Sequence, residues 1–321
     1  MRIAVIFLVC HMALSGLWAQ TKPLAPFAAS EMLLQSPTGS LSGTLTVPAG
    51  NGPFKVVLII AGSGPTDRDG NSTAGVQTNA YRMLSEGFAA KGIASLRYDK
   101  RGIAASRSAM ISESEIRFET YISDAVSWIA RLQNDKRFSD VVVLGHSEGS
   151  LIGMVAALQT TAAKFISVSG VGRPADKLIQ EQLKGKLEPR LLNEAYKTLA
   201  SLKAGMQVQQ VDPALVSLFR PSVQPYMISW MKYDPTKEIA RLKIPVCIVQ
   251  GTTDMQVTIQ DAKWLAEAKP GAQLILMEKM NHVLKESEAD VQQNSATYRD
   301  PVLPLKAGLI DTLARFISAS R

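Results

Sequence analysis

Short apolar runs recur along the chain and are separated by longer segments whose apolar positions follow a helical period. Residues 41–48 alternate apolar and polar side chains, which is the pattern of a strand with one buried face. Residues 54–61 are almost continuously apolar and β-branched, as in strands that are covered on both faces. The remaining strand-like runs are residues 93–98, 140–144, 164–168, 244–250 and 273–277.

Helical patterns fill most of the intervals between these runs. They cover residues 76–91, 115–132, 151–158 and 259–268, and residues 302–317 supply a closing helix. Strands that alternate with helices favour an α/β fold, in which a mostly parallel central sheet is flanked by helices on both faces.

One long interval, residues 171–240, contains no buried-strand pattern. It is rich in Lys, Gln, Leu and Met and has helical stretches at residues 175–186 and 191–204, while prolines interrupt its second half. An insertion of this length between two core strands typically forms a cap above the sheet. We therefore predict a core of residues 20–170 and 241–321 and a helical cap or lid of residues 171–240.

The N-terminus has the pattern of a secretory signal peptide. Arg2 precedes an apolar stretch that starts at Ile3, and Ala19 is a small residue at a suitable cleavage point. The stretch is marginal for a membrane span, which needs about 20 apolar residues. We expect residues 1–19 to be removed and the protein to be exported, periplasmic or extracellular, without stable membrane insertion. An uncleaved anchor is the alternative.

The distribution of charge argues against a nucleic-acid partner. The formal net charge is +7, but Lys and Arg are scattered and never form a run of five or six. Nucleic-acid binding normally needs a clustered basic face, so no nucleic-acid partner is expected.

Without the signal peptide, Cys247 is the single cysteine, so no intramolecular disulfide is possible. Its apolar surroundings predict a buried, inert thiol.

The pentapeptide Gly-His-Ser-Glu-Gly at residues 145–149 joins a predicted strand directly to a predicted helix. A G-x-S-x-G sequence in this setting is typical of a nucleophile elbow, a sharp turn that exposes the serine hydroxyl. Side chains at Gly145 and Gly149 would collide with neighbouring backbone in such a turn. We therefore predict that Ser147 is a nucleophile.

A serine hydroxyl needs a base, and histidine is the usual one because its pKa lies near neutrality. The chain has three histidines. His11 departs with the signal peptide, and His146 directly precedes Ser147, so its side chain leaves the opposite side of the strand end. His282, which follows the last predicted core strand, is the remaining candidate.

A carboxylate should orient this imidazole and stabilise its cation. Asp254 follows the predicted strand at residues 244–250 and therefore sits at the same sheet edge as Ser147. Asp261, inside the next helical pattern, and Glu278, at the end of the last strand, are alternatives. The chain order Ser147, Asp254, His282 is the one expected of α/β-hydrolases.

Acyl transfer also needs hydrogen-bond donors for the oxyanion, each contributing about 3–4 kcal/mol. We expect one oxyanion-hole donor to be the backbone N–H of Glu148 at the helix N-terminus. The other should come from the glycine-containing loop at residues 62–70. There we favour the N–H of Ser63, with Gly64 second. Phosphate binding by this loop is not expected, because no Gly-Lys-Ser/Thr sequence follows it.

These features resemble the bacterial α/β-hydrolases of the serine aminopeptidase-like and esterase-like type. The resemblance spans about residues 40–320 and rests on residues 41–48, 62–71, 97–102, 145–149, 251–254 and 281–285. It implies the α/β-hydrolase fold, the triad of Ser147, Asp254 and His282, no cofactor or metal, and hydrolysis of carboxylic esters or related acyl compounds. One departure is Ala61, where many relatives carry a His that is usually structural.

Several side chains allow two interpretations. The Glu148 carboxylate is either anchored by a cation such as Arg101, or it binds an amino group or repels anionic acyl chains. Residues 67–69 are expected to form a local salt-bridged loop. Aromatic and Met side chains of the cap either form its core or line an apolar substrate pocket; they are Phe219, Tyr226, Met227, Trp230 and Met231. Of these, Tyr226 and Trp230, together with Gly64, are the candidate substrate-binding residues.

The resulting hypothesis is a secreted serine esterase that acts on a small-molecule acyl ester through an acyl-enzyme. A peptidase that releases N-terminal residues and a thioesterase could use the same triad. A catalytically inactive binding protein on the same fold is the alternative from another class.

Overall fold

The computed structural model describes residues 27–110 and 112–320, so the predicted signal peptide at residues 1–19 lies outside the described part. Its centre is one sheet with the strand order β1-β2-β4-β3-β5-β6-β7-β8. From β4 to β8 all neighbouring strands are parallel, whereas β1 and β2 form an antiparallel hairpin and β2 pairs antiparallel with β4. The strands are β1 (Phe27–Ser36), β2 (Gly39–Pro48), β3 (Phe54–Ile60), β4 (Ala94–Tyr98), β5 (Phe138–His146), β6 (Lys164–Val168), β7 (Val246–Gly251) and β8 (Gln273–Met277).

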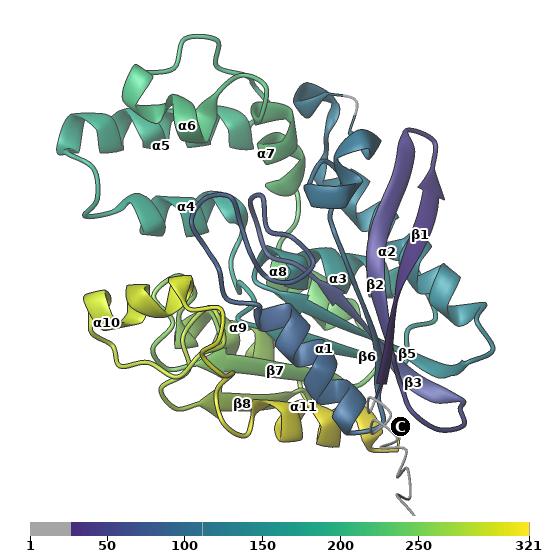
Figure 1. Cartoon of the computed structure of the whole chain (residues 1–321). Helices are drawn as coiled ribbons and strands as arrows, with labels where there is room; N and C mark the ends of the chain where they lie inside the picture. The colour runs from purple at the N-terminus through teal and green to yellow at the C-terminus, as the bar shows by residue number, and fades with distance from the viewer. Residues whose placement is uncertain (1–26, 111, 321) are drawn as a thin grey trace, which may run out of the picture.

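Helices cover both faces of this sheet, as the alternating pattern predicts (Figure 1). One face carries α1 (Ala80–Ala90) and α11 (Leu309–Ser318). The other face carries α2 (Phe118–Gln133), α3 (Glu148–Leu158), α8 (Pro235–Arg241) and α9 (Ile259–Ala268). The sheet with helices on both faces agrees with the predicted fold class.

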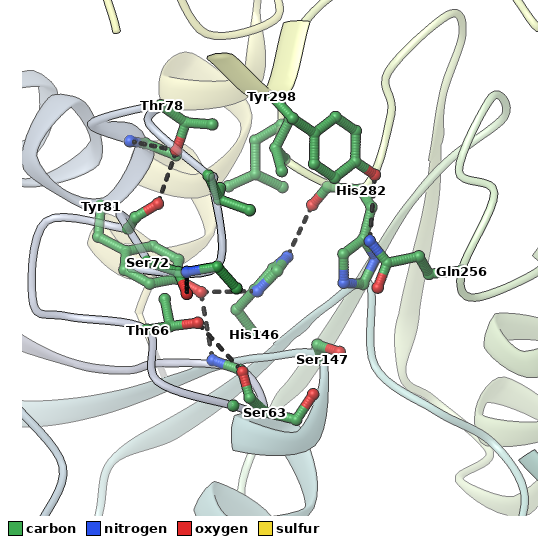
Figure 2. A pocket seen from close by; sticks show the side chains of 18 of the residues that line it. Ser63, Thr66, Ser72, Thr78, Tyr81, His146, Ser147, Gln256, His282 and Tyr298 are labelled. Carbon is green, nitrogen blue, oxygen red and sulfur yellow. Dashed lines mark hydrogen bonds between the residues drawn. The ribbon is translucent and has the colours of Figure 1, made fainter. Parts of the chain in front are cut away.

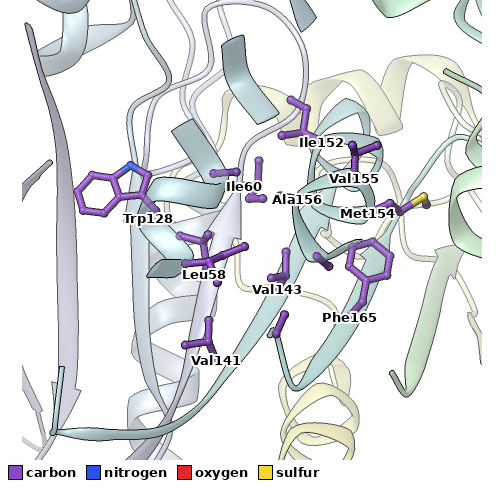
Figure 3. Packing of buried hydrophobic residues seen from close by; sticks show 14 of the residues in the cluster. Leu58, Ile60, Trp128, Val141, Val143, Ile152, Met154, Val155, Ala156 and Phe165 are labelled. Atoms are coloured by element: carbon purple, nitrogen blue, oxygen red, sulfur yellow. The ribbon is translucent and has the colours of Figure 1, made fainter. Parts of the chain in front are cut away.

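The central strands are apolar on both faces because each face supports its own core. On β3, Leu58 belongs to the core beneath α2 and α3, whereas its neighbour Ile59 belongs to the core beneath α1 and α11. Figure 3 shows Leu58 with Val143 of β5 among side chains of the flanking helices. This alternation explains why these strands appear as continuous apolar runs in the sequence.

The hairpin strand β1 was not predicted from the sequence. Among the described strands it lies at the edge of the sheet and pairs only with β2, and its side chains are exposed or half-buried. With no buried face along most of its length, it lacks the apolar alternation by which a strand is recognised.

The closing helix is also shorter than predicted. It begins at Leu309 rather than at residue 302, because Pro304 interrupts the segment and Gly308 adopts a φ of 81° directly before the helix.

Between β6 and β7 the chain forms a helical insertion. Its first four helices are α4 (Ala175–Leu183), α5 (Pro189–Lys203), α6 (Val216–Phe219) and α7 (Gln224–Trp230). They share a hydrophobic cluster of their own and stand apart from the sheet (Figure 1). The last helix, α8, contributes Ile239 to the core of the sheet. The separate unit, here called the cap, therefore ends before α8 and is shorter than residues 171–240.

The small helix α10 (Val291–Ala296) lies in the segment between β8 and α11. In residues 27–110 and 112–320, no helix combines the length and the apolar character that a membrane crossing requires.

Candidate active site

Ser147 occupies a strained turn between β5 and α3. Its φ of 54° and ψ of −123° lie outside the regions that L-residues favour. Both glycines of the motif are required by close backbone contacts. A Cβ on Gly145 would lie 2.2 Å from the carbonyl oxygen of Gly149, and a Cβ on Gly149 would lie 2.4 Å from that of Ile60. The backbone thus has the geometry of a nucleophile elbow.

Asp254 and His282 come from neighbouring segments at the same sheet edge. Asp254 follows β7, His282 follows β8, and the Nδ1 of His282 lies 2.8 Å from the Oδ2 of Asp254. The other carboxylate oxygen of Asp254 accepts hydrogen bonds from the amides of Gln256 and Val257, at 2.8 and 2.9 Å. The structure therefore brings the predicted orienting carboxylate, Asp254, into contact with the predicted base, His282.

The surroundings keep Asp254 ionised. Burial raises the pKa of this carboxyl, but the charge and hydrogen bond of His282 and the two amides outweigh burial and lower the pKa to about 2. An ionised carboxylate can only accept, so Nδ1 of His282 carries the proton. In a neutral imidazole the other nitrogen, Nε2, is then unprotonated and available as a base.

The alternative carboxylates are placed elsewhere. Asp261 is buried in α9 and forms a salt bridge of 2.6 Å with Arg173. Glu278 is exposed in the turn after β8. Of the three candidates considered, Asp254 is the one hydrogen-bonded to His282.

His146 has a structural position next to the nucleophile. Its Nε2 lies 2.8 Å from the carbonyl oxygen of His282, and its Nδ1 lies 2.8 Å from the hydroxyl of Tyr81. Figure 2 shows its ring between Tyr81 and the backbone of His282. Burial lowers the pKa of His146 to about 3, with the nearby His282 contributing in the same direction. Since both ring nitrogens are engaged, His146 is poorly suited to act as the base.

The loop after β3 comes close to the elbow. A Cβ on Gly62 would lie 3.2 Å from the Cβ of Ser147, so a side chain at this position would crowd the nucleophile. The next residue, Ser63, is exposed and lines the same cavity as Ser147. The first amides of α3, including that of Glu148, have no acceptor within the helix because they begin it. Glu148 therefore follows Ser147 directly, and Ser63 lines the same cavity as Ser147.

The Glu148 side chain has partners other than the expected one. Its Oε2 lies 3.4 Å from the Nζ of Lys100, and its Oε1 accepts a hydrogen bond of 2.6 Å from the hydroxyl of Tyr226 in the cap. Arg101, which was expected to anchor it, instead forms a salt bridge of 2.6 Å with Asp124 on α2. Consecutive side chains after a strand point in different directions, so Lys100 faces Glu148 and Arg101 faces α2.

Charged residues 67–69 were expected to pair with each other, and that expectation is wrong. Arg68 forms a salt bridge of 2.7 Å with Asp99, and Asp69 forms one of 2.8 Å with Arg97. Both partners lie on or directly after β4, the strand that neighbours β3. The ion pairs therefore fasten the loop after β3 to the adjacent strand.

Two cavities meet at this loop. The first, of about 250 Å³, is lined by Ser147 and His282 and has a largely apolar wall. Its other lining residues include Ser63, Val76, Tyr81, Leu284 and Tyr298. The second, of about 320 Å³, lies beneath the cap and is lined by Lys100, Glu148 and Tyr226. Gly64 and Pro65 border both cavities.

Some of the candidate substrate-binding residues line a cavity, and others pack in a hydrophobic core. Gly64 and Tyr226 line a cavity. Trp230 lines neither of the two cavities and stacks on Phe118 of α2, with 6.1 Å between ring centroids. Phe219, Met227 and Met231 are buried in the hydrophobic cluster of the cap. Most of the aromatic and Met positions thus serve packing, because the small cap must bury its own apolar faces.

The sequence pattern does not identify Tyr81 and Lys100 as residues of the site, although both contact the Gly62 backbone. Tyr81 is one apolar position within the pattern of α1, and Lys100 lies between two other charged residues. The predicted burial of the Cys247 thiol agrees with the structure, where burial raises the pKa of the thiol to about 12. Within residues 27–110 and 112–320, no group of three or more His, Cys, Asp or Glu side chains is arranged to hold a metal ion.

Comparison with known proteins connects this site to a family. The family model described as serine aminopeptidase, S33, matches residues 74–288, which include Ser147, Asp254 and His282. The chain is 29% identical to Esterase EstD of Thermotoga maritima over 287 residues, or 86% of its own length. It spans 65% of the length of that curated relative.

Solved structures agree with the fold. Est1E from Butyrivibrio proteoclasticus, solved with ferulic acid bound, superposes with a TM-score of 0.57 at 14% identity, covering 89% of this chain and 96% of that one. The α/β-hydrolase GrgF from Penicillium superposes with a TM-score of 0.55 at 18% identity, covering 79% and 91%. At these identities the likeness concerns the fold alone.

Proposed function

The chain belongs to the serine aminopeptidase S33 family of α/β-hydrolases, and on this premise we propose that it hydrolyses carboxylic esters with Ser147 as the nucleophile. The observation that carries the proposal is the pairing of Asp254 with His282 at 2.8 Å beside a strained Ser147, with both Ser147 and His282 lining one cavity. The esterase relative from Thermotoga maritima supports esters over amides as the substrate class.

In the proposed acylation step, the Nε2 of His282 takes the proton of Ser147 while Oγ attacks the ester carbonyl carbon. The electron pair of the carbonyl moves to its oxygen, and the N–H groups of Ser63 and Glu148 hold the resulting oxyanion. Asp254 stabilises the imidazolium. The tetrahedral intermediate then expels the alcohol, which receives its proton from His282, and an acyl-enzyme remains.

Deacylation repeats these roles with water. His282 takes a proton from water, and the hydroxide attacks the acyl carbon. In the second tetrahedral intermediate the bond between the acyl carbon and Oγ of Ser147 then breaks, Oγ receives the proton from His282, and the carboxylic acid leaves. No cofactor is needed, because each step moves only protons and electron pairs among these groups.

The first cavity suggests the kind of ester. Its volume of about 250 Å³ is below the range of about 300–1,000 Å³ that drug-sized ligands occupy, and its wall is mostly apolar. We therefore propose small, uncharged acyl or alcohol groups as its occupants.

An aminopeptidase is the second enzymatic candidate, because the family model carries that description. An aminopeptidase needs a carboxylate that can receive the substrate's free amino group. The carboxylate beside the nucleophile, Glu148, is already paired with Lys100 and hydrogen-bonded to Tyr226, and this favours the esterase.

Two measurements test the proposal. Nitrophenyl esters and aminoacyl-anilides should be compared as substrates, and we expect ester turnover to exceed anilide turnover. A fluorophosphonate probe should label the wild-type protein but not the Ser147→Ala variant. Faster anilide turnover would favour the peptidase, and an unlabelled wild-type protein would favour an inactive binding protein.

We also propose that the protein is exported after removal of residues 1–19, on the sequence pattern alone. N-terminal sequencing of the protein from the extracytoplasmic fraction tests this. A mature N-terminus near residue 20 is expected, whereas an intact Met1 would contradict cleavage.

A further inference from the structure

Both backbone polar groups of Gly62, the N–H and the carbonyl oxygen, form hydrogen bonds with side chains. Its N–H donates a hydrogen bond of 3.2 Å to the hydroxyl of Tyr81, and its carbonyl oxygen accepts one of 2.5 Å from the Nζ of Lys100. The peptide bond that joins Gly62 to Ser63 is trans. In a planar trans peptide the C=O and the N–H point in opposite directions. The contact with Lys100 therefore also sets the direction of the Ser63 N–H.

The residues around this peptide line two different cavities. Lys100 lines the cavity beneath the cap, whereas Ser63 and Ser147 line the other cavity. The loop that continues into Gly64 and Pro65 borders both. Because the carbonyl points toward Lys100, the opposite end of the peptide, the Ser63 N–H, points away from Lys100.

Lys100 also contacts the segment that carries the second donor. Its Nζ lies 3.4 Å from the Oε2 of Glu148, the residue that follows Ser147 and begins α3. An ammonium has three protons to donate, so one lysine can bind both groups. The two side chains are 2% and 5% exposed, so water competes little for either contact.

We infer that Lys100 is a positioning residue for the oxyanion hole, which holds the amides of Ser63 and Glu148 in the orientation that receives the developing negative charge. The inference rests on the proposed ester hydrolysis. Lys100 does not touch the reacting atoms and acts through the Gly62 carbonyl and the Glu148 carboxylate. A purely structural ion pair would affect the stability of the fold but not the binding of the transition state.

The test replaces Lys100 by methionine, which keeps the length of the side chain and removes its charge and donors. Loss of a whole oxyanion donor lowers kcat by about 10²–10³-fold, so a donor that is present but poorly oriented should lower it by about 10–100-fold. KM should change by less than about threefold, since ground-state binding is largely kept. The affinity for a trifluoromethyl ketone, which forms a tetrahedral adduct with the serine, should fall by about the same factor as kcat.

Lys164→Met is the matched control. Lys164 is also buried, and its Nζ donates to the carbonyl oxygens of Phe316 and Ala319, at 2.7 and 2.6 Å. It is the first residue of β6 and therefore lies at the amino ends of the parallel strands, whereas the elbow lies at their carboxyl ends. Its loss should lower the melting temperature without changing kcat or the ketone affinity.

A second variant covers the case in which Lys100→Met does not fold because Glu148 is left as an unpaired buried charge. The double variant Lys100→Met/Glu148→Gln removes both charges, and its kcat should still fall by at least about tenfold, because the Gly62 carbonyl has lost its donor. An unchanged kcat and ketone affinity in a folded Lys100 variant would overturn the inference and leave ester hydrolysis standing. A wild-type protein that neither hydrolyses esters nor binds the ketone would overturn both.

Discussion

The imidazole of His146 donates a hydrogen bond of 2.8 Å from Nε2 to the carbonyl oxygen of His282. The residue before the candidate nucleophile thus holds the backbone of the candidate base. The same ring accepts a hydrogen bond from Tyr81, whose hydroxyl in turn accepts one from the N–H of Gly62. One buried chain of hydrogen bonds therefore links the loop after β3, the elbow and the candidate base.

Removal of the Tyr81 hydroxyl should weaken both the fold and the proposed catalysis. Tyr81→Phe leaves the N–H of Gly62 and the Nδ1 of His146 without their partner, and each is buried. The free energy of unfolding should fall by about 1–3 kcal/mol. The turnover of a nitrophenyl ester should also decrease, because two segments of the site lose a shared contact.

Tyr98→Phe provides the control for this variant. Tyr98 is equally buried, but its hydroxyl has no hydrogen-bond partner among the described residues. Its removal should leave the unfolding free energy unchanged or increase it, as measured by urea denaturation of both variants. Equal losses in the two variants would show that the Tyr81 hydroxyl contributes nothing specific.

Acid should destabilise the protein through His146. An unfolded histidine takes up a proton near pH 6.5, whereas burial keeps His146 neutral in the folded protein down to about pH 3. Stability from this group is complete above about pH 6.5 and is lost progressively as the pH falls toward 3, because only the unfolded state gains the proton. The loss should reach at most about 5 kcal/mol at the lower limit.

Unfolding free energies measured by urea denaturation between pH 8 and pH 4 test this expectation. The His146→Gln variant should be less stable at neutral pH but show a shallower decline toward acid. An NMR titration in which the His146 ring of the folded protein gains its proton near pH 6.5 would rule the expectation out.

Asp254→Asn should reduce kcat by about 10³–10⁴-fold, as the loss of the orienting carboxylate does in other triads. The amide can donate to Nδ1 of His282, which favours the tautomer whose Nε2 carries the proton and cannot act as a base. Steady-state kinetics with one ester at neutral pH measures the effect. Glu278→Gln, which changes an exposed carboxylate, should keep wild-type kinetics, and the reverse outcome would identify Glu278 as the partner.

The ion pair of Lys100 and Glu148 carries no net charge, so the wild-type enzyme should have little preference between cationic and anionic esters. The measured quantity is the ratio of kcat/KM for two esters of equal size whose charged groups reach the cavity beneath the cap. Glu148→Gln should shift the ratio about tenfold toward the anionic ester, and Lys100→Met should shift it toward the cationic one. The double variant should restore the wild-type ratio. A shift that persists in the double variant would show that the two charges do not compensate each other.

Much of the fold could be predicted from the sequence because its signals are local. The buried strands appear as apolar runs since both faces of β3 and β5 are covered by helices. The elbow could be located because its sharp backbone turn requires Gly145 and Gly149. The edge strand β1 and the late start of α11 could not, because an exposed strand has no apolar pattern and the helix start depends on Gly308.

The sequence by itself also determined the candidates Ser147, Asp254 and His282, because parallel strands place the residues after their carboxyl ends at one sheet edge. Their catalytic roles stay predictions, although Asp254 and His282 are hydrogen-bonded. Only the tertiary structure decided that Glu148 pairs with Lys100 rather than Arg101, and that Tyr226 faces a cavity while Trp230 stacks on Phe118. The physical reason is that a side chain's partner depends on its direction and on what packs opposite it, and segments distant in the sequence set both.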